Sequence, residues 1–309
     1  MFPFSPLPLL LKGLILKELE PIDMFCFSLI SKKSHFLAKR SKLVVNEVEW
    51  TVCEDNTTIH VIGTRNGQCF WWRILLCDPT YSEPEGPKFD AQINDTKFGV
   101  YVHTESASQW VHMVSSENAK VFAEVISNRL MDVLKPQQFS LWIEDCSIPP
   151  YILRYTRTFE SVHAAFSETR LHDNDALTLL NEITADHLNL DYSAFTVPEE
   201  QPSLKHRCIN LNVAPWFTKE LLMKMECESL YVVKPNLTSE DLQTFFEAWK
   251  EGKYPKLSAL QIHMKRGFQW NLNLAPVDDD GEQVINDVGG KIGELFIDDD
   301  SLIFLVSLE

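Results

Sequence analysis

The sequence predicts an α+β protein whose three regions differ in the spacing of their apolar residues. In roughly the first 40 residues, apolar side chains recur every three or four positions, as in helices. Between residues 43 and 115 they alternate, as in half-buried strands. After residue 136, strand-like cores alternate with helical segments, which is typical of parallel strands joined by helices. We therefore expect domains at 3–42, 43–135 and 136–309.

Composition and charge narrow the class of protein. The 309 residues are 45% hydrophobic and 23% charged, an ordinary globular composition, and the net charge of −16 argues against nucleic acid or an anionic membrane as partner. No run of 18 apolar residues is present, so we expect no membrane span. The seven cysteines form no C-x-x-C motif, which indicates reduced thiols and a cytoplasmic or nuclear location.

The opening stretch predicts two or three short helices with more apolar surface than they can bury by themselves. Leu7, Leu11, Leu14 or Ile15, and Leu19 follow helical spacing from Pro8, which suits a first turn. Pro21 ends this segment and opens a second helix. The apolar side of that helix consists of Met24, Phe27, Leu29 and Ile30, and a basic tail follows with Lys32, Lys33, Lys39 and Arg40.

This stretch resembles an F-box, a helical unit of about 40 residues that docks on a Skp1-type adaptor and thereby joins a cullin-based ubiquitin ligase. The resemblance implies that the matching positions bind the adaptor. These positions are Leu7, Pro8, Leu11, Ile15, Leu19, Pro21, Met24, Phe27, Ile30, Ser31 and Lys32.

Two other interpretations of the opening stretch are open. One is a helical hairpin that packs on its own domain. The other is a signal peptide, since LPLLLKGLIL has the length of an apolar signal core. Against a signal peptide, no positively charged segment precedes this run and no small-residue cleavage site follows it.

The second region predicts a small antiparallel sheet followed by a helix. Asn66-Gly67 indicates a hairpin turn, and the proline-rich stretch 79–87 an exposed loop. Trp71 and Trp72 cannot both face inward on a regular strand. The expected helix is Ser116–Leu134, capped by Ser116, with Val121, Phe122, Val125, Ile126, Leu130 and Leu134 buried. The expected strands are Leu43–Val52, Ile59–Gly63, Cys69–Cys77, Phe98–His103 and Gln109–Val114.

The third region predicts parallel strands with helices on one side. Its recurring x-Leu-x-Leu/Ile/Val cores resemble a degenerate leucine-rich repeat, and two alternating runs, Lys291–Ile297 and Leu302–Leu308, predict a C-terminal hairpin. The expected helices are Asn174–Ile183, Pro215–Met225 and Ser239–Lys250. The expected strands are Ser140–Glu144, Ser161–Phe166, His187–Asp191, Cys208–Asn212, Ser229–Val233 and Ala259–His263.

Residues 215–262 resemble the type 2 F-box-associated region (FBA_2) of the large nematode F-box family. In that family the region selects the target protein, and its ligand-contacting residues are mostly undefined. The resemblance rests on Pro215-Trp216, Ser229-Leu230, Asn236-Leu237-Thr238 with Asp241-Leu242, Trp249, and Pro255-Lys256-Leu257 with Leu260.

Sites for bond chemistry are not indicated. Asp278-Asp279-Asp280-Gly281 fails the calcium-loop template because Pro276 and Asp287 occupy ligand positions. The nine histidines form no zinc-ligand spacing, and no nucleophile or phosphate-binding motif is present. We therefore expect no catalytic residue, no metal and no cofactor.

The two resemblances together imply a non-enzymatic substrate receptor of a Skp1–cullin–F-box (SCF) ubiquitin ligase. It would hold a Skp1-type adaptor at 3–42 and an unknown protein substrate through the C-terminal domain. The alternatives are a repeat-like interaction scaffold without a ligase role and an enzyme whose site forms only in three dimensions.

Overall fold

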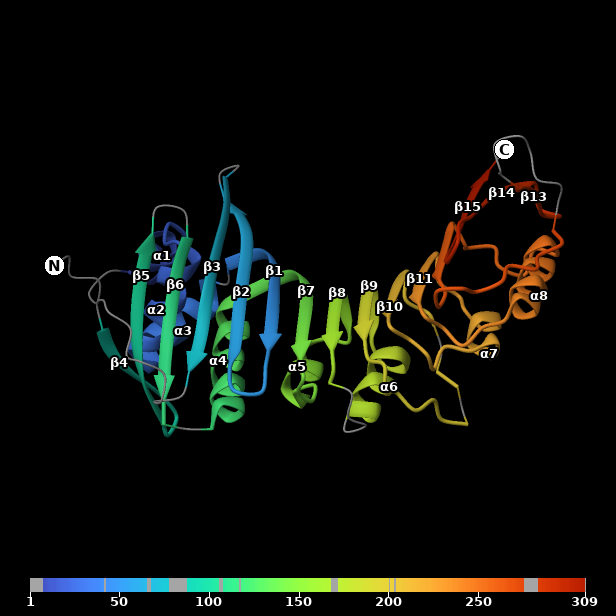
Figure 1. Ribbon diagram of the computed structural model, residues 1–309. Coiled ribbons are helices and arrows are strands. Elements are labelled where there is room, and N and C mark those ends of the chain that lie inside the picture. The colour runs from blue at the N-terminus through green and yellow to red at the C-terminus, as the bar shows by residue number, and fades with distance from the viewer. Residues whose placement is uncertain are drawn as a thin grey trace. The chain divides into compact units, whose positions relative to one another are not determined.

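The computed structural model describes residues 8–41, 43–65, 68–77, 88–105, 108–116, 118–167, 172–199, 201–202, 204–274 and 283–308 (Figure 1). Leu7, the Asn66-Gly67 turn, the loop 79–87 and the acidic turn 278–281 lie outside these ranges. The chain divides into two compact units. The first consists of Met1–Trp142 with Pro149–Leu153, and the second of Ile143–Ile148 with Arg154–Glu309.

The opening stretch forms the three expected short helices, which belong to the same compact unit as the sheet that follows. Pro21 occupies the first turn of its helix, and Asp23 lies in that same turn, where negative charge is favourable. Ser31 and Ser34 cap the third helix reciprocally, since the Ser34 amide donates to Ser31 Oγ and Ser34 Oγ donates to the Ser31 carbonyl. The helices are α1 (Leu9–Lys17), α2 (Pro21–Ile30) and α3 (Lys32–Ser41).

The sheet of the first unit is larger than the small antiparallel sheet expected, and it is not purely antiparallel. Its strands run in the order β7-β1-β2-β3-β6-β5-β4, and β3 pairs with β6 in parallel. The expectation missed β4, because Lys88–Ile93 is short and only one of its residues is β-branched. The strands are β1 (Leu43–Val52), β2 (Thr57–Arg65), β3 (Gln68–Cys77), β4 (Lys88–Ile93), β5 (Thr96–Glu105), β6 (Ser108–Ser115) and β7 (Leu134–Glu144).

Helix α4 (Ala119–Val133) packs on this sheet and corrects two expectations. Its N-cap is Asn118, whose side chain accepts from the Lys120 amide, and not Ser116. Val121 is 52% exposed, because the buried side of the helix is centred on Phe122, Ile126 and Leu130.

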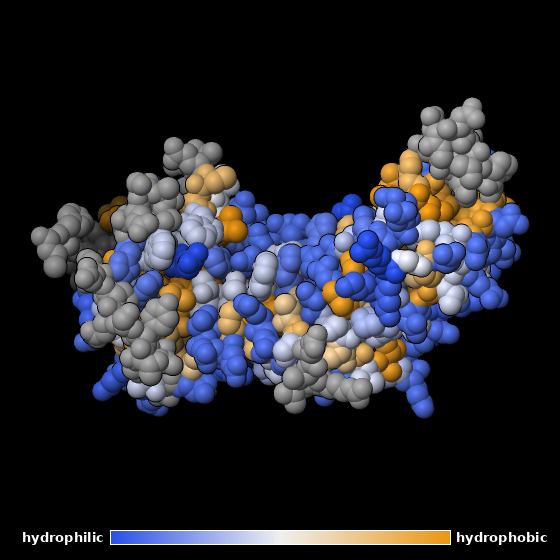
Figure 2. Space-filling view, viewed as in Figure 1, coloured by the Kyte–Doolittle hydropathy of each residue, from blue (hydrophilic) through white to orange (hydrophobic). Residues whose placement is uncertain are grey.

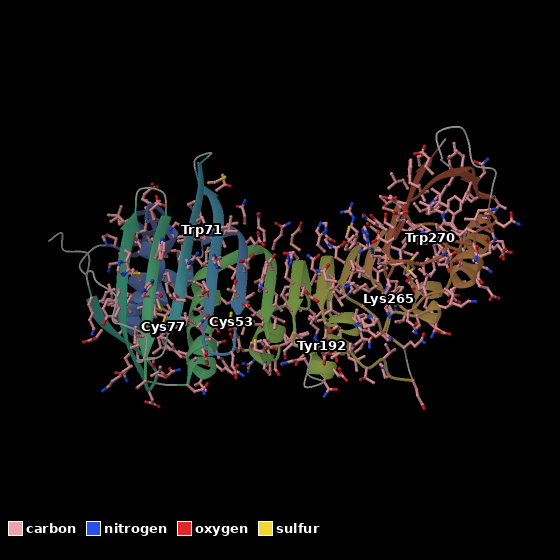
Figure 3. All side chains as sticks on the ribbon, in the orientation of Figure 1. Cys53, Trp71, Cys77, Tyr192, Lys265 and Trp270 are labelled. Atoms are coloured by element: carbon pink, nitrogen blue, oxygen red, sulfur yellow. The ribbon has the colours of Figure 1, made fainter. Side chains whose placement is uncertain are left out.

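Neighbouring tryptophans on β3 take opposite sides of the sheet, as the pleat requires. Trp72 is buried, and its ring centroid lies 5.9 Å from that of Phe25 on α2, so α2 is fixed to the sheet. Trp71, labelled in Figure 3, is 36% exposed. The Arg73 guanidinium carbon lies 5.3 Å from the centre of its ring, a cation–π contact.

The second unit contains the expected parallel array, in which β8 pairs with β9, β9 with β10, β10 with β11, and β11 with β12. Its classification as a leucine-rich-repeat type stays a prediction. The strands are β8 (Thr158–Ala165), β9 (Thr184–Asp191), β10 (Cys208–Asn212), β11 (Ser229–Val233) and β12 (Ala259–His263). The connecting helices are α6 (Asp173–Asn181), α7 (Lys219–Met223) and α8 (Ser239–Lys250), and α5 (Pro150–Tyr155) lies where the chain passes between the units.

The C-terminal hairpin extends this sheet at the edge next to β12. Strand β15 (Ser301–Leu308) pairs antiparallel with both β12 and β14 (Lys291–Ile297), and β14 pairs with the short strand β13 (Gln283–Asn286). Phe304 of β15 is buried against Trp249 of α8, with ring centroids 4.9 Å apart. This contact joins the hairpin to the helical layer. Among the helices of the described ranges, none has the length and apolar character to cross a membrane.

We expect the first unit to lose stability in mild acid through His60 of β2. Burial, reinforced by the charge of Arg73, lowers the pKa of His60 from 6.5 to about 4. Below pH 6.5 the unfolded chain therefore takes up a proton at this position that the native state excludes until about pH 4, so stability falls as pH falls.

The variant His60→Gln removes this difference. Between pH 7 and pH 5 it should lose about 2 kcal/mol less stability than the unsubstituted chain. Urea unfolding followed by tryptophan fluorescence at the two pH values measures this difference. An identical pH dependence in both proteins would contradict the assignment.

Candidate protein-binding surfaces

Apolar side chains of α1 remain in contact with solvent. Leu11 is 45% exposed, Leu14 53% and Ile15 37%, whereas Leu16, on the opposite side of the helix, is buried. Three adjacent aliphatic side chains on one short helix form an apolar patch of the kind that marks an interaction site. We call these three residues the α1 patch.

Helices α2 and α3 add further exposed apolar side chains. Ile30, at the end of α2, is 69% exposed, and Phe36 of α3 is 55% exposed. The Arg40 guanidinium carbon lies 5.6 Å from the centre of the Phe36 ring. Much of the rest of α2 faces inward, and Met24 and Phe25 have no exposed surface.

The structure therefore distributes the adaptor-binding residues predicted by the F-box resemblance over different environments. Leu11, Ile15 and Ile30 present apolar surface, as an interface requires. Pro21 and Met24 are buried, because α2 is apolar on more than one side and its packing on the sheet selects which side is covered. Of the remaining positions, Pro8, Ser31 and Lys32 are exposed, Leu19 and Phe27 are half-buried, and Leu7 lies outside the described residues.

The second unit exposes one face of its parallel strands. Side chains alternate strictly along β10, β11 and β12, with every second residue buried. The buried positions are apolar and nearly inaccessible, namely Leu188, Leu190, Ile209, Leu211, Leu230, Val232, Leu260 and Ile262. The alternate positions form the face that we call the open face.

A continuous row of polar side chains crosses the open face from strand to strand. The register aligns His163 with Asn189, Asn189 with Asn210, Asn210 with Tyr231, and Tyr231 with Gln261. The Asn210 amide donates to Asn189 Oδ1 at 2.5 Å, and Asn189 Nδ2 lies 3.0 Å from His163 Nδ1. Burial lowers the pKa of His163, which favours the neutral ring that can accept this hydrogen bond. These hydrogen bonds order the histidine–asparagine part of the row, from His163 to Asn210.

The row ends at apolar residues of the C-terminal hairpin. Gln261 is aligned with Ile303 of β15, and Leu305 of the same strand is 44% exposed. Figure 2 shows hydrophobic surface over β15. A shallow groove of about 420 Å³ runs from the asparagines to these two residues. The open face thus offers amide donors and acceptors at one end and aliphatic surface at the other, a combination suited to a peptide or protein partner.

Sequence reasoning named none of the five residues of this row as a binding residue, although a signal was present. The strand cores read His-Leu-Asn-Leu-Asp, Cys-Ile-Asn-Leu-Asn, Ser-Leu-Tyr-Val-Val and Ala-Leu-Gln-Ile-His. Once the apolar positions are assigned to the helical side, the polar positions between them must share the other face.

Residues that carry the F-box-associated resemblance have structural roles. The Trp216 indole donates to the Tyr192 carbonyl at 2.6 Å, and Trp249 is buried against Phe304. Thr238 is the N-cap of α8 and forms a capping box with Asp241. These residues determine the fold of the region and leave its ligand undefined.

Comparison with known proteins finds a family match within the second unit and one relative that aligns with most of the chain. Residues 201–262 match the family described as F-box associated (FBA_2). The chain is also 23% identical over 285 residues to an uncharacterized protein of Caenorhabditis elegans, F59B2.9. That alignment covers 87% of this chain and 62% of the relative, so the chain spans less than two thirds of the relative's length.

No solved structure matches the chain. The match at 201–262 begins before β10 and ends within β12, so it contains α7, β11 and α8. Three of the five residues of the open-face row, Asn210, Tyr231 and Gln261, therefore lie in a segment that matches the F-box-associated family.

Substitutions at two neighbouring residues of β11 should differ in their loss of stability, because one residue lies in the core and the other on the open face. Leu230→Ala should destabilise the second unit by about 2–5 kcal/mol, because Leu230 is buried under the helices. Tyr231→Ala should cost about 1 kcal/mol or less, the contribution of its edge contact with His263. Thermal unfolding of both variants measures the difference, and equal losses would show that the open face is a covered core.

Proposed function

We propose that this protein is a non-enzymatic substrate receptor of a Skp1–cullin–F-box ubiquitin ligase, acting in the cytoplasm or nucleus. The single observation that carries the proposal is the match of residues 201–262 to the F-box-associated family. In this function, the α1–α3 helices bind a Skp1-type adaptor and the open face binds the target. Holding both raises the effective concentration of the target near the ligase, so no bond chemistry is required of this chain.

The α1 patch supports the adaptor half of the proposal. It leaves aliphatic surface uncovered on the segment that resembles an F-box, and Ile30 and Phe36 provide more apolar surface on the following helices. Buried contacts within the first unit hold these helices in place, as the packing of Phe25 on Trp72 illustrates. An interface presented on a rigid support loses less conformational entropy on binding.

A charge in the α1 patch should abolish adaptor binding. We expect Leu11→Asp and Ile15→Asp each to prevent co-purification with co-expressed Skp1-type adaptors, because an interface buries these side chains and a carboxylate there would be unpaired. Val121→Asp is the matched control, since Val121 is an equally exposed aliphatic residue of the same unit, on α4. Retention of adaptor by both α1 variants would refute this role, provided that circular dichroism shows all variants folded.

The open face supports the target half of the proposal. The row of polar side chains on this face offers hydrogen bonds to a polypeptide. Ile303 and Leu305 supply apolar contact beside it. The family match covers the scaffold that positions Asn210, Tyr231 and Gln261. Specificity for a target would then reside in exposed residues that the fold does not constrain.

A variant of the open face should lose targets while keeping the adaptor. We expect Asn210→Ala combined with Tyr231→Ala to remove a defined set of proteins from an affinity purification, whereas Leu11→Asp should remove the adaptor and cullin and keep that set. Quantitative protein identification in both purifications measures the two losses. If the open-face variant keeps every protein found with the unsubstituted chain, the target does not bind there.

The second candidate function is an interaction scaffold without a ligase role. The open face favours it as much as it favours a receptor, since that surface requires no adaptor. The same purifications distinguish the two functions, because a scaffold would recover open-face partners without any Skp1-type adaptor or cullin.

A further inference from the structure

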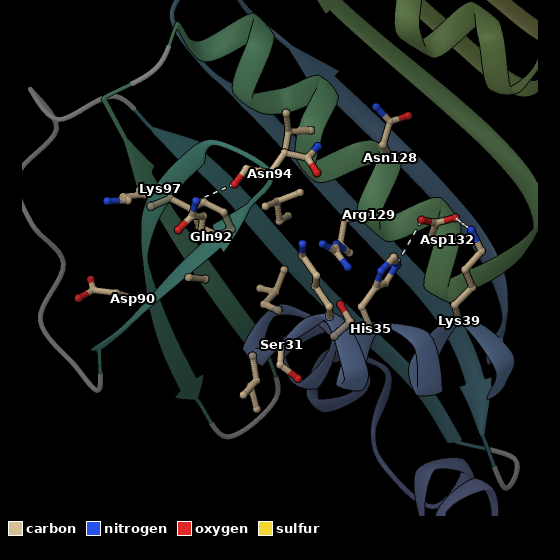
Figure 4. A pocket seen from close by; sticks show the side chains of 18 of the residues that line it. Ser31, His35, Lys39, Asp90, Gln92, Asn94, Lys97, Asn128, Arg129 and Asp132 are labelled. Carbon is tan, nitrogen blue, oxygen red and sulfur yellow. Dashed lines mark hydrogen bonds and ion pairs between the residues drawn. The ribbon is translucent and has the colours of Figure 1, made fainter. Parts of the chain in front are cut away.

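A groove of about 1520 Å³ opens on the first unit, and none of the three α1-patch residues lines it (Figure 4). Its walls come from three segments far apart in the sequence: the α2–α3 junction, the β4–β5 hairpin and the C-terminal half of α4. Apolar residues of its lining include Ile30, Ile93, Phe98 and Val125.

The groove contains a guanidinium with one buried nitrogen that lacks a hydrogen-bond acceptor. Arg129 of α4 points into the groove in Figure 4, and its Nη1 is buried with no hydrogen-bond partner among the described residues. Burial lowers the pKa of Arg129, and the nearby charge of Asp132 only partly opposes this effect. A half-buried guanidinium that lacks an acceptor is disfavoured until an anion reaches it.

Asp132 is the nearest carboxylate, and other residues already engage it. Lys39 Nζ donates to its Oδ1 at 2.5 Å, and His35 Nε2 lies 3.2 Å from its Oδ2. Burial, with the charge of Arg129 as the next cause, lowers the pKa of His35. A neutral His35 does not compete with Arg129 for an anion.

The remaining charges of the lining favour an anion as well. The lining includes the cations Lys32, Lys39, Lys97 and Arg129 against the carboxylates Asp90 and Asp132. The groove is therefore positive, whereas the whole chain carries a net charge of −16. Because the overall negative charge repels nucleic acid and anionic membranes, a short peptide with one or two anionic groups fits the surface better.

We propose that the groove binds a short peptide segment that places an oxyanion against Arg129 and apolar side chains against Ile30 and Phe98. The oxyanion is the carboxylate of Asp or Glu or a phosphoryl group, since either accepts hydrogen bonds from a guanidinium. The groove shares Ile30 and Phe36 with the apolar surface that α2 and α3 add to the proposed adaptor surface, and it contains no residue of the α1 patch. The peptide proposal does not require that the chain join a ligase.

Peptide pools of defined chemistry test the proposal with the full chain. Each pool contains nine-residue peptides with Leu, Ile, Val or Phe on both sides of one central residue, which is Glu, phosphoserine or Gln. The immobilised chain should retain the Glu or the phosphoserine pool at least tenfold more than the Gln pool, the discrimination expected for a charge-assisted hydrogen bond. The pool that is retained more strongly identifies the oxyanion as carboxylate or phosphoryl.

Arg129→Met should retain the three pools equally, and Lys120→Met is the matched control. Lys120 is an exposed cation of the same helix outside the groove, so its removal changes the net charge equally and should leave the discrimination intact. Arg129→Met should also melt no lower than the unsubstituted chain, because it removes a half-buried charge that Asp132 only partly offsets and whose Nη1 has no hydrogen-bond partner.

Three results would overturn the proposal. The first is equal retention of all pools by the unsubstituted chain, and the second is unchanged discrimination in Arg129→Met. The third is a melting temperature of Arg129→Met lower by several degrees, which would make Arg129 a structural residue.

Discussion

The alternation of side chains along β9–β12 is the constraint on which the second unit depends. Helices cover one face of these strands, and Leu188, Leu211, Leu230 and Ile262 fill the space between the layers. A shift of one residue in any strand would expose its apolar set and bury its polar set, so the register is strongly specified. The row of polar side chains from His163 to Gln261 results from the same alternation, because it occupies the positions between the buried ones.

Helices have different roles in the two units. In the first unit, most of α2 packs on the sheet, whereas α1, the last residue of α2 and Phe36 of α3 present apolar surface outward. In the second unit the helices are packing elements, and the strands carry the exposed chemistry. The residues matched by the F-box-associated family, such as Trp216 and Thr238, belong to packing and turns. A family match at these residues therefore identifies a scaffold without identifying its ligand.

Local patterns predicted most elements, and long-range packing explains the failures. The bounds of β1, β10, β11, β12 and α8 agree with the sequence expectation, because their periodicity is regular and capping residues bound the helix. Strand β4 was missed, since it has few β-branched residues and follows a proline-rich loop. Exposure on α1 and α2 was only partly predictable, because helical spacing shows that an apolar side exists and cannot show what covers it. The groove at Arg129 joins residues from three distant segments, so no local pattern could reveal it.

The strands that end the sheet order of each unit limit how these sheets meet other molecules. Strand β4 spans Lys88–Ile93, and its residues Lys88, Asp90 and Gln92 are exposed, while β13 is only four residues long. Short strands with charged or amide side chains are poor templates for edge-to-edge pairing. We therefore expect partners to approach these margins through side chains and not by adding a strand.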